Sequence, residues 1–163
     1  MGIRKRDLPP ETLRQVMAHA KPKRKAKKPI VFVEPVVCFH MNILYMKLPI
    51  ETKSEINLRS WRCRAKRSKT ARNVVGNYFP QDAATFFRLK WITGHGLRIT
   101  LTRLGGRKLD RSNLPTALKA TEDGVAEMIG ANDGDERWQA SWHQEPGGPV
   151  GVRIEVEVAD GWE

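Results

Sequence analysis

Carboxylates gather around one short segment of this chain, residues 107–135, and a lysine stands among them. Lys119 and Asp123 lie four residues apart, which places them on the same side of a helix. Carboxylates hold hard cations such as Mg²⁺ through oxygen, and basic side chains hold phosphates. The pattern predicts a metal-dependent site for a polyanionic substrate. Four aspartates are the candidate metal ligands: Asp110, Asp123, Asp133 and Asp135.

The same segment also fits an ordinary surface helix. Ser112 is a good N-cap, Pro115 is tolerated in the first turn, and Gly130 is a good stop. Lys119 and Asp123 fall nearly opposite the apolar stripe, so they could form only a solvated ion pair. Ser112 lies two helical turns before Lys119, however, so a polar row on this face could form one wall of a site.

Positive charge is concentrated in two places outside that segment. The chain has 163 residues, 40% of them hydrophobic, with a net charge of +11, and residues 1–28 hold ten Lys or Arg against two acidic residues. Residues 59–72 hold seven basic residues and no acidic one. Such charge predicts a polyanionic partner, most often nucleic acid, or an anionic membrane surface. The candidate DNA contacts are Lys23, Arg24, Lys25, Lys27, Lys28, Arg59, Arg62, Arg64, Lys66, Arg67, Lys69 and Arg72.

Cysteine usage and the N-terminal composition predict a soluble cytoplasmic protein. Cys38 and Cys63 cannot build a disulfide framework or a zinc site, which fits a reducing compartment. The basic start followed by the apolar run 30–39 mimics a secretion signal, but Glu34 and Pro35 interrupt that run. Ten residues are also too few to span a bilayer, so no membrane partner is expected.

The pattern along the chain predicts a basic N-terminal arm, residues 1–29, and one domain, residues 30–163. The arm is either a DNA contact or a solubilising tail. The domain is predicted to be α+β (mixed α/β), with a single sheet and two main helices. The chain is expected to begin with strands from residue 30 and at 43–50, followed by a basic helix at 57–78. Strands at 86–92 and 97–102 then lead into the acidic helix, and strands at 138–142 and 152–158 end the domain. The loops on either side of the acidic helix would then meet at one edge of the sheet, which brings Asp110 close to Asp133.

Two stretches of the chain carry a resemblance to a known family. The first runs from LPI at 48–50 through Ser54, Asn57 and Trp61 into the basic helix that ends near Arg72. The second is LDRSNL at 109–114, LKA at 118–120, DG at 123–124 and IGANDGD at 129–135, and the last strand, 151–156, also fits. This pattern resembles the RusA-like Holliday-junction resolvases, especially the shorter versions carried by bacteriophages and prophages. The resemblance covers residues 43–158 and leaves the arm outside it.

The resemblance implies a Mg²⁺-dependent endonuclease, with Mn²⁺ as a possible substitute, that cuts four-way DNA junctions as a homodimer in the bacterial cytoplasm. Asp110 matches the first metal-binding aspartate, Asp133 the aspartate after the helix, and Lys119 the functional lysine. Asn113 matches the asparagine of the DxDN motif, and Asp123 a further acidic position. Asp110, Lys119 and Asp133 are therefore the expected catalytic residues, with phage or prophage origin as a corollary.

Two positions depart from the family pattern. Ser112 stands where the family has its second aspartate, and Asn132 stands where it has the first of a pair. Each change removes a negative charge, so affinity for Mg²⁺ should fall. Two alternatives therefore stay open: a weakened or inactive junction-binding protein of the same fold, and a basic RNA- or ribosome-associated protein, which the arm alone would allow.

Overall fold

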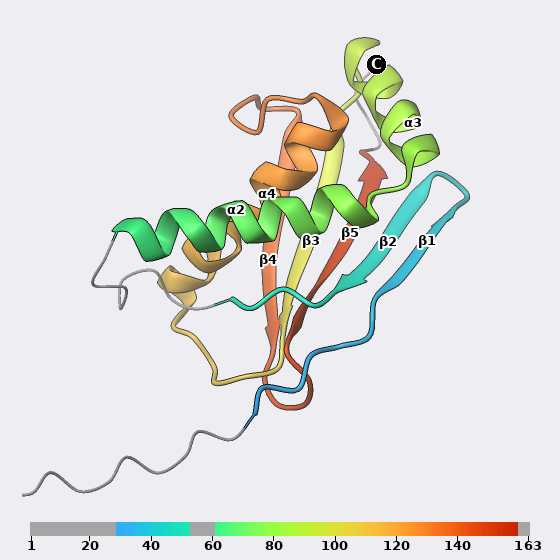
Figure 1. Cartoon of the computed structure of the whole chain (residues 1–163). Helices are drawn as coiled ribbons and strands as arrows, with labels where there is room; N and C mark the ends of the chain where they lie inside the picture. The colour runs from blue at the N-terminus through green and yellow to red at the C-terminus, as the bar shows by residue number, and fades with distance from the viewer. Residues whose placement is uncertain (1–28, 53–60, 160–163) are drawn as a thin grey trace, which may run out of the picture.

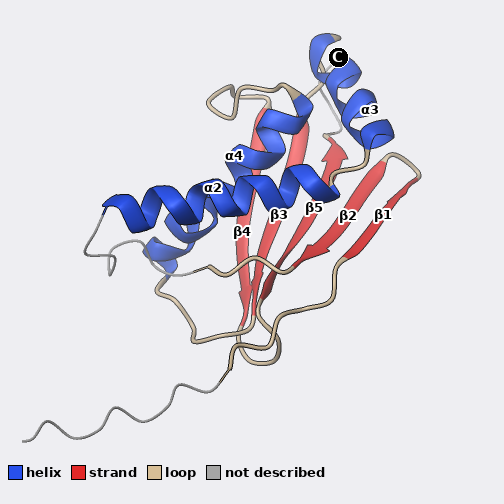
Figure 2. Cartoon of the chain, viewed as in Figure 1, coloured by secondary structure: helices blue, strands red, loops and turns tan. Residues whose placement is uncertain are grey.

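A computed structural model describes residues 29–52 and 61–159 of the chain. Its sheet has five strands in the order β1-β2-β5-β3-β4. The strands are β1 (Val36–His40), β2 (Ile43–Leu48), β3 (Leu97–Leu104), β4 (Trp138–Glu145) and β5 (Gly151–Val158). The helices are α2 (Trp61–Tyr78), α3 (Gln81–Ile92) and α4 (Leu114–Ile129), and a short 3₁₀ turn, η3 (Arg111–Asn113), precedes α4. Helices α2 and α4 pack on one face of the sheet (Figures 1 and 2).

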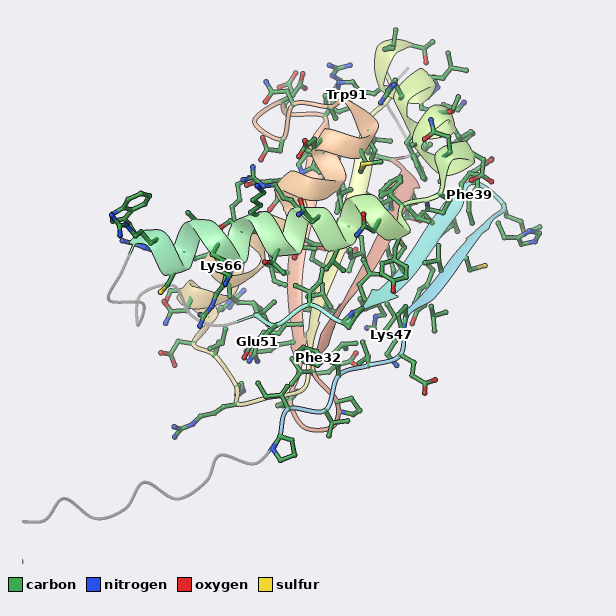
Figure 3. All side chains as sticks on the ribbon, viewed as in Figure 1. Phe32, Phe39, Lys47, Glu51, Lys66 and Trp91 are labelled. Atoms are coloured by element: carbon green, nitrogen blue, oxygen red, sulfur yellow. The ribbon has the colours of Figure 1, made fainter. Side chains whose placement is uncertain are left out.

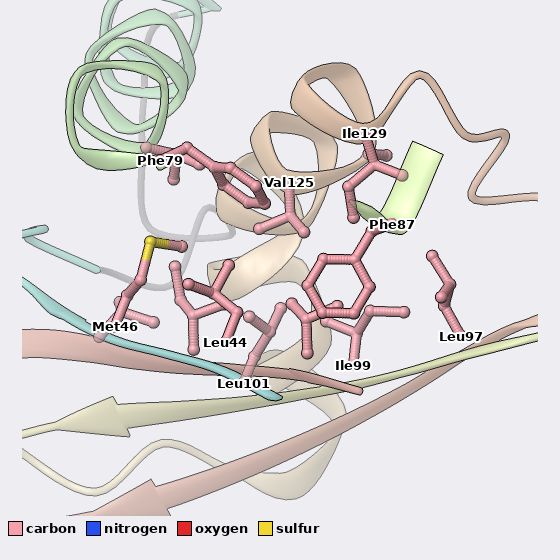
Figure 4. Close-up of a cluster of buried hydrophobic side chains, with 14 of the residues drawn as sticks. Leu44, Met46, Phe79, Phe87, Leu97, Ile99, Leu101, Val125 and Ile129 are labelled. Carbon is pink, nitrogen blue, oxygen red and sulfur yellow. The ribbon is translucent and has the colours of Figure 1, made fainter. Parts of the chain in front are cut away.

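The core lies between the sheet and the helices. Figure 4 shows Leu44, Ile99 and Leu101 of the sheet facing Val125 and Ile129 of α4, and each of these five side chains is fully buried. Alternation along the strands and the 3.6-residue period of α4 supply these two apolar faces, as expected from the sequence. The predicted α+β class with a single sheet is therefore confirmed, although the described chain has three helices instead of two.

Helices α2 and α4 pack closely against each other at Gly124. A Cβ atom placed on Gly124 would lie 3.2 Å from the Cα of Arg72 and 3.2 Å from the Cβ of Val75. A glycine therefore lets the two backbones approach at this point. The close packing fixes the basic helix alongside the helix that carries Lys119.

The strand predicted at 86–92 is wrong, because these residues belong to α3. Phe87, Leu89 and Trp91 alternate as a strand would, but Leu89 is 61% exposed while Phe87 and Trp91 are buried. Ala83 and Ala84 complete the buried set, and its spacing is helical. Three alternating residues are too few to distinguish the two-residue period of a strand from the 3.6-residue period of a helix.

The acidic helix is a crossover between two parallel strands. In the register of β3 and β4, Leu97 pairs with Trp138 and Leu104 pairs with Glu145. The loop that leaves β3 and the loop that enters β4 therefore lie at opposite ends of this strand pair, as Figure 1 shows. The expectation that they meet at one edge is wrong, because the two strands run parallel and α4 carries the chain from one end of the pair to the other.

The predictions for the arm lie outside the described residues, as do Arg59 and the start of the predicted helix 57–78. Its described part, α2, ends at Tyr78 as expected. The strand expected at 43–50 ends at Leu48, and the apolar run from residue 30 forms one bridge, from Phe32 to Val150, before β1 begins. Among the described residues, no helix is long and apolar enough to cross a membrane.

Candidate functional site

Lys119 is the centre of a carboxylate cluster on α4. Its Nζ forms a hydrogen bond and ion pair with Asp133, lies 3.2 Å from Oδ1 of Asp123, and lies 3.8 Å from Oε1 of Glu122. Partial burial opposes the ammonium charge, but the hydrogen bond to Asp133 and the attraction of Glu122 and Asp123 outweigh it and raise the pKa of Lys119. Lys119 is therefore charged at neutral pH and carries more than one partner.

Glu122 is the residue of this cluster that the sequence reasoning missed. Its side chain is buried, and the indole Nε1 groups of Trp138 and Trp142 donate hydrogen bonds to Oε1 and Oε2 at 3.1 and 3.2 Å. Burial of a carboxylate is costly unless it is paired and hydrogen-bonded, and here two indoles and Lys119 meet that need. Trp138 and Trp142 lie on one face of β4, and their spacing was the available signal.

The loop that carries Asp133 is braced from several sides. Gly130 ends α4 in the left-handed region, with φ of 75°, as predicted. Arg88 donates hydrogen bonds from α3 to the carbonyl oxygens of Met128 and Ile129, each at 3.1 Å. These bonds satisfy carbonyl groups that a helix end otherwise leaves open, and they fix the point from which the loop departs.

The second brace of this loop is Asp135, which pairs with Arg137. The two side chains form two hydrogen bonds at 3.0 and 2.8 Å, and the guanidinium stacks 4.2 Å from the ring centroid of Trp91. Figure 3 shows Trp91 beside this loop. Hydrogen bonds from Arg137 lower the pKa of Asp135 to about 2. The contacts of Asp135 thus serve the loop, and its predicted part as a metal ligand stays a prediction.

Asn132 also has a structural part in this loop. Its Oδ1 accepts a hydrogen bond from the backbone N–H of Gly134 at 3.0 Å, which is an Asx turn. An asparagine makes this bond as well as an aspartate does. The departure at residue 132 therefore preserves the turn that presents Asp133.

Asp110 lies at the other end of α4. The side chain of Gln144 bonds both the N–H and the C=O of Leu109, at 2.9 and 2.8 Å, which fixes the loop just before Asp110. Asp110 itself is exposed, and no hydrogen bond or ion pair joins its side chain to another described residue. The structure thus brings Lys119, Asp123 and Asp133 together but leaves Asp110 apart from them.

Ser112 does not cap the acidic helix, contrary to expectation. It lies inside the 3₁₀ turn, and the N-cap of α4 is Asn113, with no side-chain capping bond at either position. The 3₁₀ turn begins at Arg111 with Asp110 as its N-cap, so Ser112 falls inside the turn instead of at its start. Ser112 is exposed beside Asp110.

A cavity of about 520 Å³ opens next to the carboxylate cluster. It lies between α4, the N-terminal half of α2 and β4. Its lining residues are Ser68, Pro115, Thr116, Lys119, Ala120, Glu122, Asp123, Asp133 and Trp142. The cavity therefore offers a positive charge, several carboxylates and one aromatic face to a ligand.

The carboxylates at this cavity suit a hard divalent cation, since Asp123 and Asp133 supply the oxygen ligands that Mg²⁺ prefers. They fit it incompletely within one chain. In the described ranges, no group of three or more His, Cys, Asp or Glu side chains is arranged to hold a metal ion. Asp110, the ligand that the resemblance implies, precedes α4 and is not among the residues that line this cavity.

Basic side chains line the helix next to this cavity. Arg62, Arg64, Lys66, Lys69 and Arg72 are exposed on α2, and Figure 3 shows Lys66 projecting from it. Arg67 is the exception among the predicted contacts. It lines a second cavity, between α2 and the segment after β2, and its Nη1 is buried without a hydrogen-bond partner in the described structure. The remaining predicted contacts, Arg59 and Lys23 to Lys28, lie outside the described residues.

A scan against models of protein families and a search of curated proteins found no match to this chain.

Proposed function

We propose that this chain is a Mg²⁺-dependent endonuclease that hydrolyses phosphodiesters in branched DNA, as the resemblance to RusA-like resolvases implies. The observation that supports it best is the position of Lys119, which lies among Asp123, Asp133 and Glu122 beside a cavity. Helix α2 contributes Ser68 to the same cavity, and the exposed basic residues along this helix would hold DNA phosphates without reading the base sequence. A homodimer acting in a bacterial cell that harbours a phage or prophage is part of this proposal.

The charged side chains at the cavity, together with the residues that position them, have distinct parts in the proposed reaction. Lys119 would contact the scissile phosphate and offset the negative charge that develops there, and its raised pKa keeps it charged for that purpose. Trp138 and Trp142 hold Glu122, which in turn orients the ammonium. Asp133 and Asp123 would hold the cation, with Asp110 as a further ligand. When bound, Mg²⁺ would neutralise phosphate charge and make a water molecule more acidic.

The second candidate is a DNA-junction-binding protein that has lost catalysis. It is favoured by Ser112, which stands where the family has a metal-binding aspartate. It is also favoured by the ion pairs that Lys119 already forms with Asp123 and Asp133. Both readings predict affinity for DNA that falls steeply with salt, because the basic residues would displace condensed counterions. They differ only in whether the backbone is cut.

The test uses labelled four-way junctions, linear duplex and structured RNA, each with Mg²⁺, with Mn²⁺ and with a chelator. The nuclease reading expects junction cleavage that a chelator abolishes. Junction binding without cleavage in either metal would select the binding protein. Preference for RNA over both DNA forms would reject the two DNA readings and leave the RNA-associated alternative.

A further inference from the structure

The second cavity, between α2 and the segment after β2, has a volume of about 320 Å³. Ligand pockets in proteins commonly enclose about 300–1,000 Å³, so this cavity has room for a small molecule or for the end of a larger one. It shares no lining residue with the cavity at Lys119. Its polar lining residues are Glu51, Cys63, Lys66, Arg67 and Thr70.

The wall that α2 supplies to this cavity follows one face of the helix. Lining residues recur there at a spacing of three or four: Cys63, Arg67, Thr70 and Val74. The inward face of a helix that packs on a sheet is usually apolar. Here that face changes along its length from apolar Val74 to a thiol and a guanidinium, so a basic group stands where an apolar one is expected.

The opposite wall of the cavity is held in place by buried contacts. Ile50 is buried, and its N–H donates to the carbonyl of Leu48 at 2.9 Å. The buried hydroxyl of Thr52 accepts a hydrogen bond from Nε of the buried Arg103, also at 2.9 Å. The segment after β2 is therefore fixed on both sides of Glu51, and the cavity is formed before any ligand enters it.

Arg67 brings to this cavity a buried donor that lacks an acceptor. Its Nη1 is buried and has no hydrogen-bond partner in the described structure. No ion pair joins Arg67 or Lys66 to another described residue. A buried donor left without an acceptor costs free energy, and the cost is greater for a charged group. The hydroxyl of Thr70 already donates to the carbonyl of Lys66 at 2.9 Å, so Arg67 and Lys66 are the donors that remain for a ligand.

These donors suit an anion with several acceptor oxygens. Figure 3 shows Lys66 and Glu51 on the two facing elements, and the carboxylate of Glu51 opposes an anion. The two basic side chains outnumber it, however. A terminal phosphate offers three strong acceptor oxygens and pairs well with a guanidinium group. A backbone phosphodiester is bonded on both sides and runs along the protein surface, which keeps it from a buried nitrogen.

We propose that this cavity binds a terminal phosphate group through Arg67 and Lys66, with the body of the ligand against Ile50 and Val74. Two sources carry this chemistry: a small phosphorylated molecule such as a nucleotide, and the 5′ end of a DNA strand. The inference does not depend on the proposed cleavage, because the cavity is separate from the one at Lys119.

The thiol of Cys63 lines the cavity and supplies the readout. Its alkylation by iodoacetamide is followed by mass spectrometry with a chelator present. The rate should fall about tenfold at a ligand concentration of ten times Kd, because only the empty cavity admits the reagent. Cys38, exposed on β1, is the control within the same chain and should react at an unchanged rate. The probes are AMP against adenosine, and a 5′-phosphorylated single strand against the same strand with a 5′-hydroxyl.

The two pairs of probes separate the sources of the phosphate. Better protection by AMP than by adenosine would identify a free phosphorylated molecule, and better protection by the phosphorylated strand would identify a strand end. If the terminal phosphate makes no difference in either pair, the proposal is overturned.

Substitution of Arg67 tests its part in the binding. Arg67→Met should abolish the protection of Cys63, whereas Arg64→Met, exposed on the same helix and outside the cavity, should keep it. Lys66→Met, at an exposed position, should weaken the protection and decides the matter if Arg67→Met does not fold. Protection that survives both substitutions overturns the assignment of the phosphate to these two side chains.

Discussion

The two ends of helix α4 differ in how many side-chain contacts hold the adjoining loop. At the C-terminal end, Arg88 bonds two carbonyl groups of α4, and Arg137 links Asp135 to Trp91, so the loop with Asp133 is held on several sides. At the N-terminal end, Asp110 and Ser112 are exposed, and Gln144 holds only the backbone before them. The braced end has the features of a preorganised site. The open end is suited to meet a partner or a substrate.

The largest effect is expected from removing Lys119, the side chain that pairs with Asp133 of the braced loop. Lys119→Gln should reduce junction cleavage by about 100-fold to 1,000-fold, the usual range when one group that stabilises developing charge is lost. Lys90→Gln on α3 is the matched control, and it should cut as the wild type does. Single-turnover rates with excess enzyme give the comparison, and equal rates for Lys119→Gln and Lys90→Gln would remove Lys119 from the reaction.

The next effect concerns the contact between Glu122 of α4 and the two tryptophans of β4. Glu122→Gln leaves one carbonyl oxygen to accept from two indoles, so one buried N–H loses its partner at a cost of about 1–3 kcal/mol. For a chain of this size the melting temperature should fall by roughly 2–10 °C. The exposed Glu127→Gln on the same helix should change stability by less than about 0.5 kcal/mol. A melting curve for Glu122→Gln that matches this control would show that the indole bonds contribute little.

A smaller effect, which depends on pH, concerns the Asp135–Arg137 brace. Arg137 lowers the pKa of Asp135 from 3.8 to about 2, so the pair stabilises the fold above pH 3.8, and that contribution is lost as pH falls towards 2. Arg137→Gln should therefore lower the melting temperature most at pH 5 to 7, by about a few degrees, and less at pH 2 to 3. Some loss should persist in acid, because the stacking on Trp91 is also removed. A difference from wild type that is constant with pH would contradict the pairing, and Arg62→Gln, exposed on α2, controls for net charge.

The smallest effect on stability is expected at the open end. Ser112 is exposed in the 3₁₀ turn and makes no capping bond, so Ser112→Asp should change the free energy of unfolding by less than about 0.5 kcal/mol. It adds a carboxylate next to Asp110 and should tighten Mn²⁺ binding in calorimetry. Metal affinity that does not change would place the cation away from this end of α4.

The sequence predicted the parts of the site that depend on one helix. The i,i+4 pair of Lys119 and Asp123 was expected and is observed at 3.2 Å, and Gly130 ends the helix as predicted. Both follow from helical geometry within a few residues. The exposure of the basic side chains of α2 was also expected and is observed except at Arg67, which lines the cavity beside the segment after β2, and their contact with DNA stays a prediction.

The features that the sequence missed depend on contacts between elements. The buried position of Glu122 depends on two tryptophans of β4, 16 and 20 residues further along the chain. The direction of β4 relative to β3 separates the loops that carry Asp110 and Asp133. The strand-helix-strand order favours such a parallel pair, but which strands become neighbours is decided by contacts between elements. Helix α3 was missed because three apolar residues happened to alternate.

The measurement that tests the proposed nuclease most directly is junction cleavage by Asp133→Asn, run beside junction binding. The substitution keeps the shape of the side chain and removes the charge that the braced end presents. The expected result is binding at least as tight as that of the wild type, with cleavage lost in both Mg²⁺ and Mn²⁺. Cleavage by Asp133→Asn at the wild-type rate would contradict the assignment of the site to the Lys119–Asp133 pair.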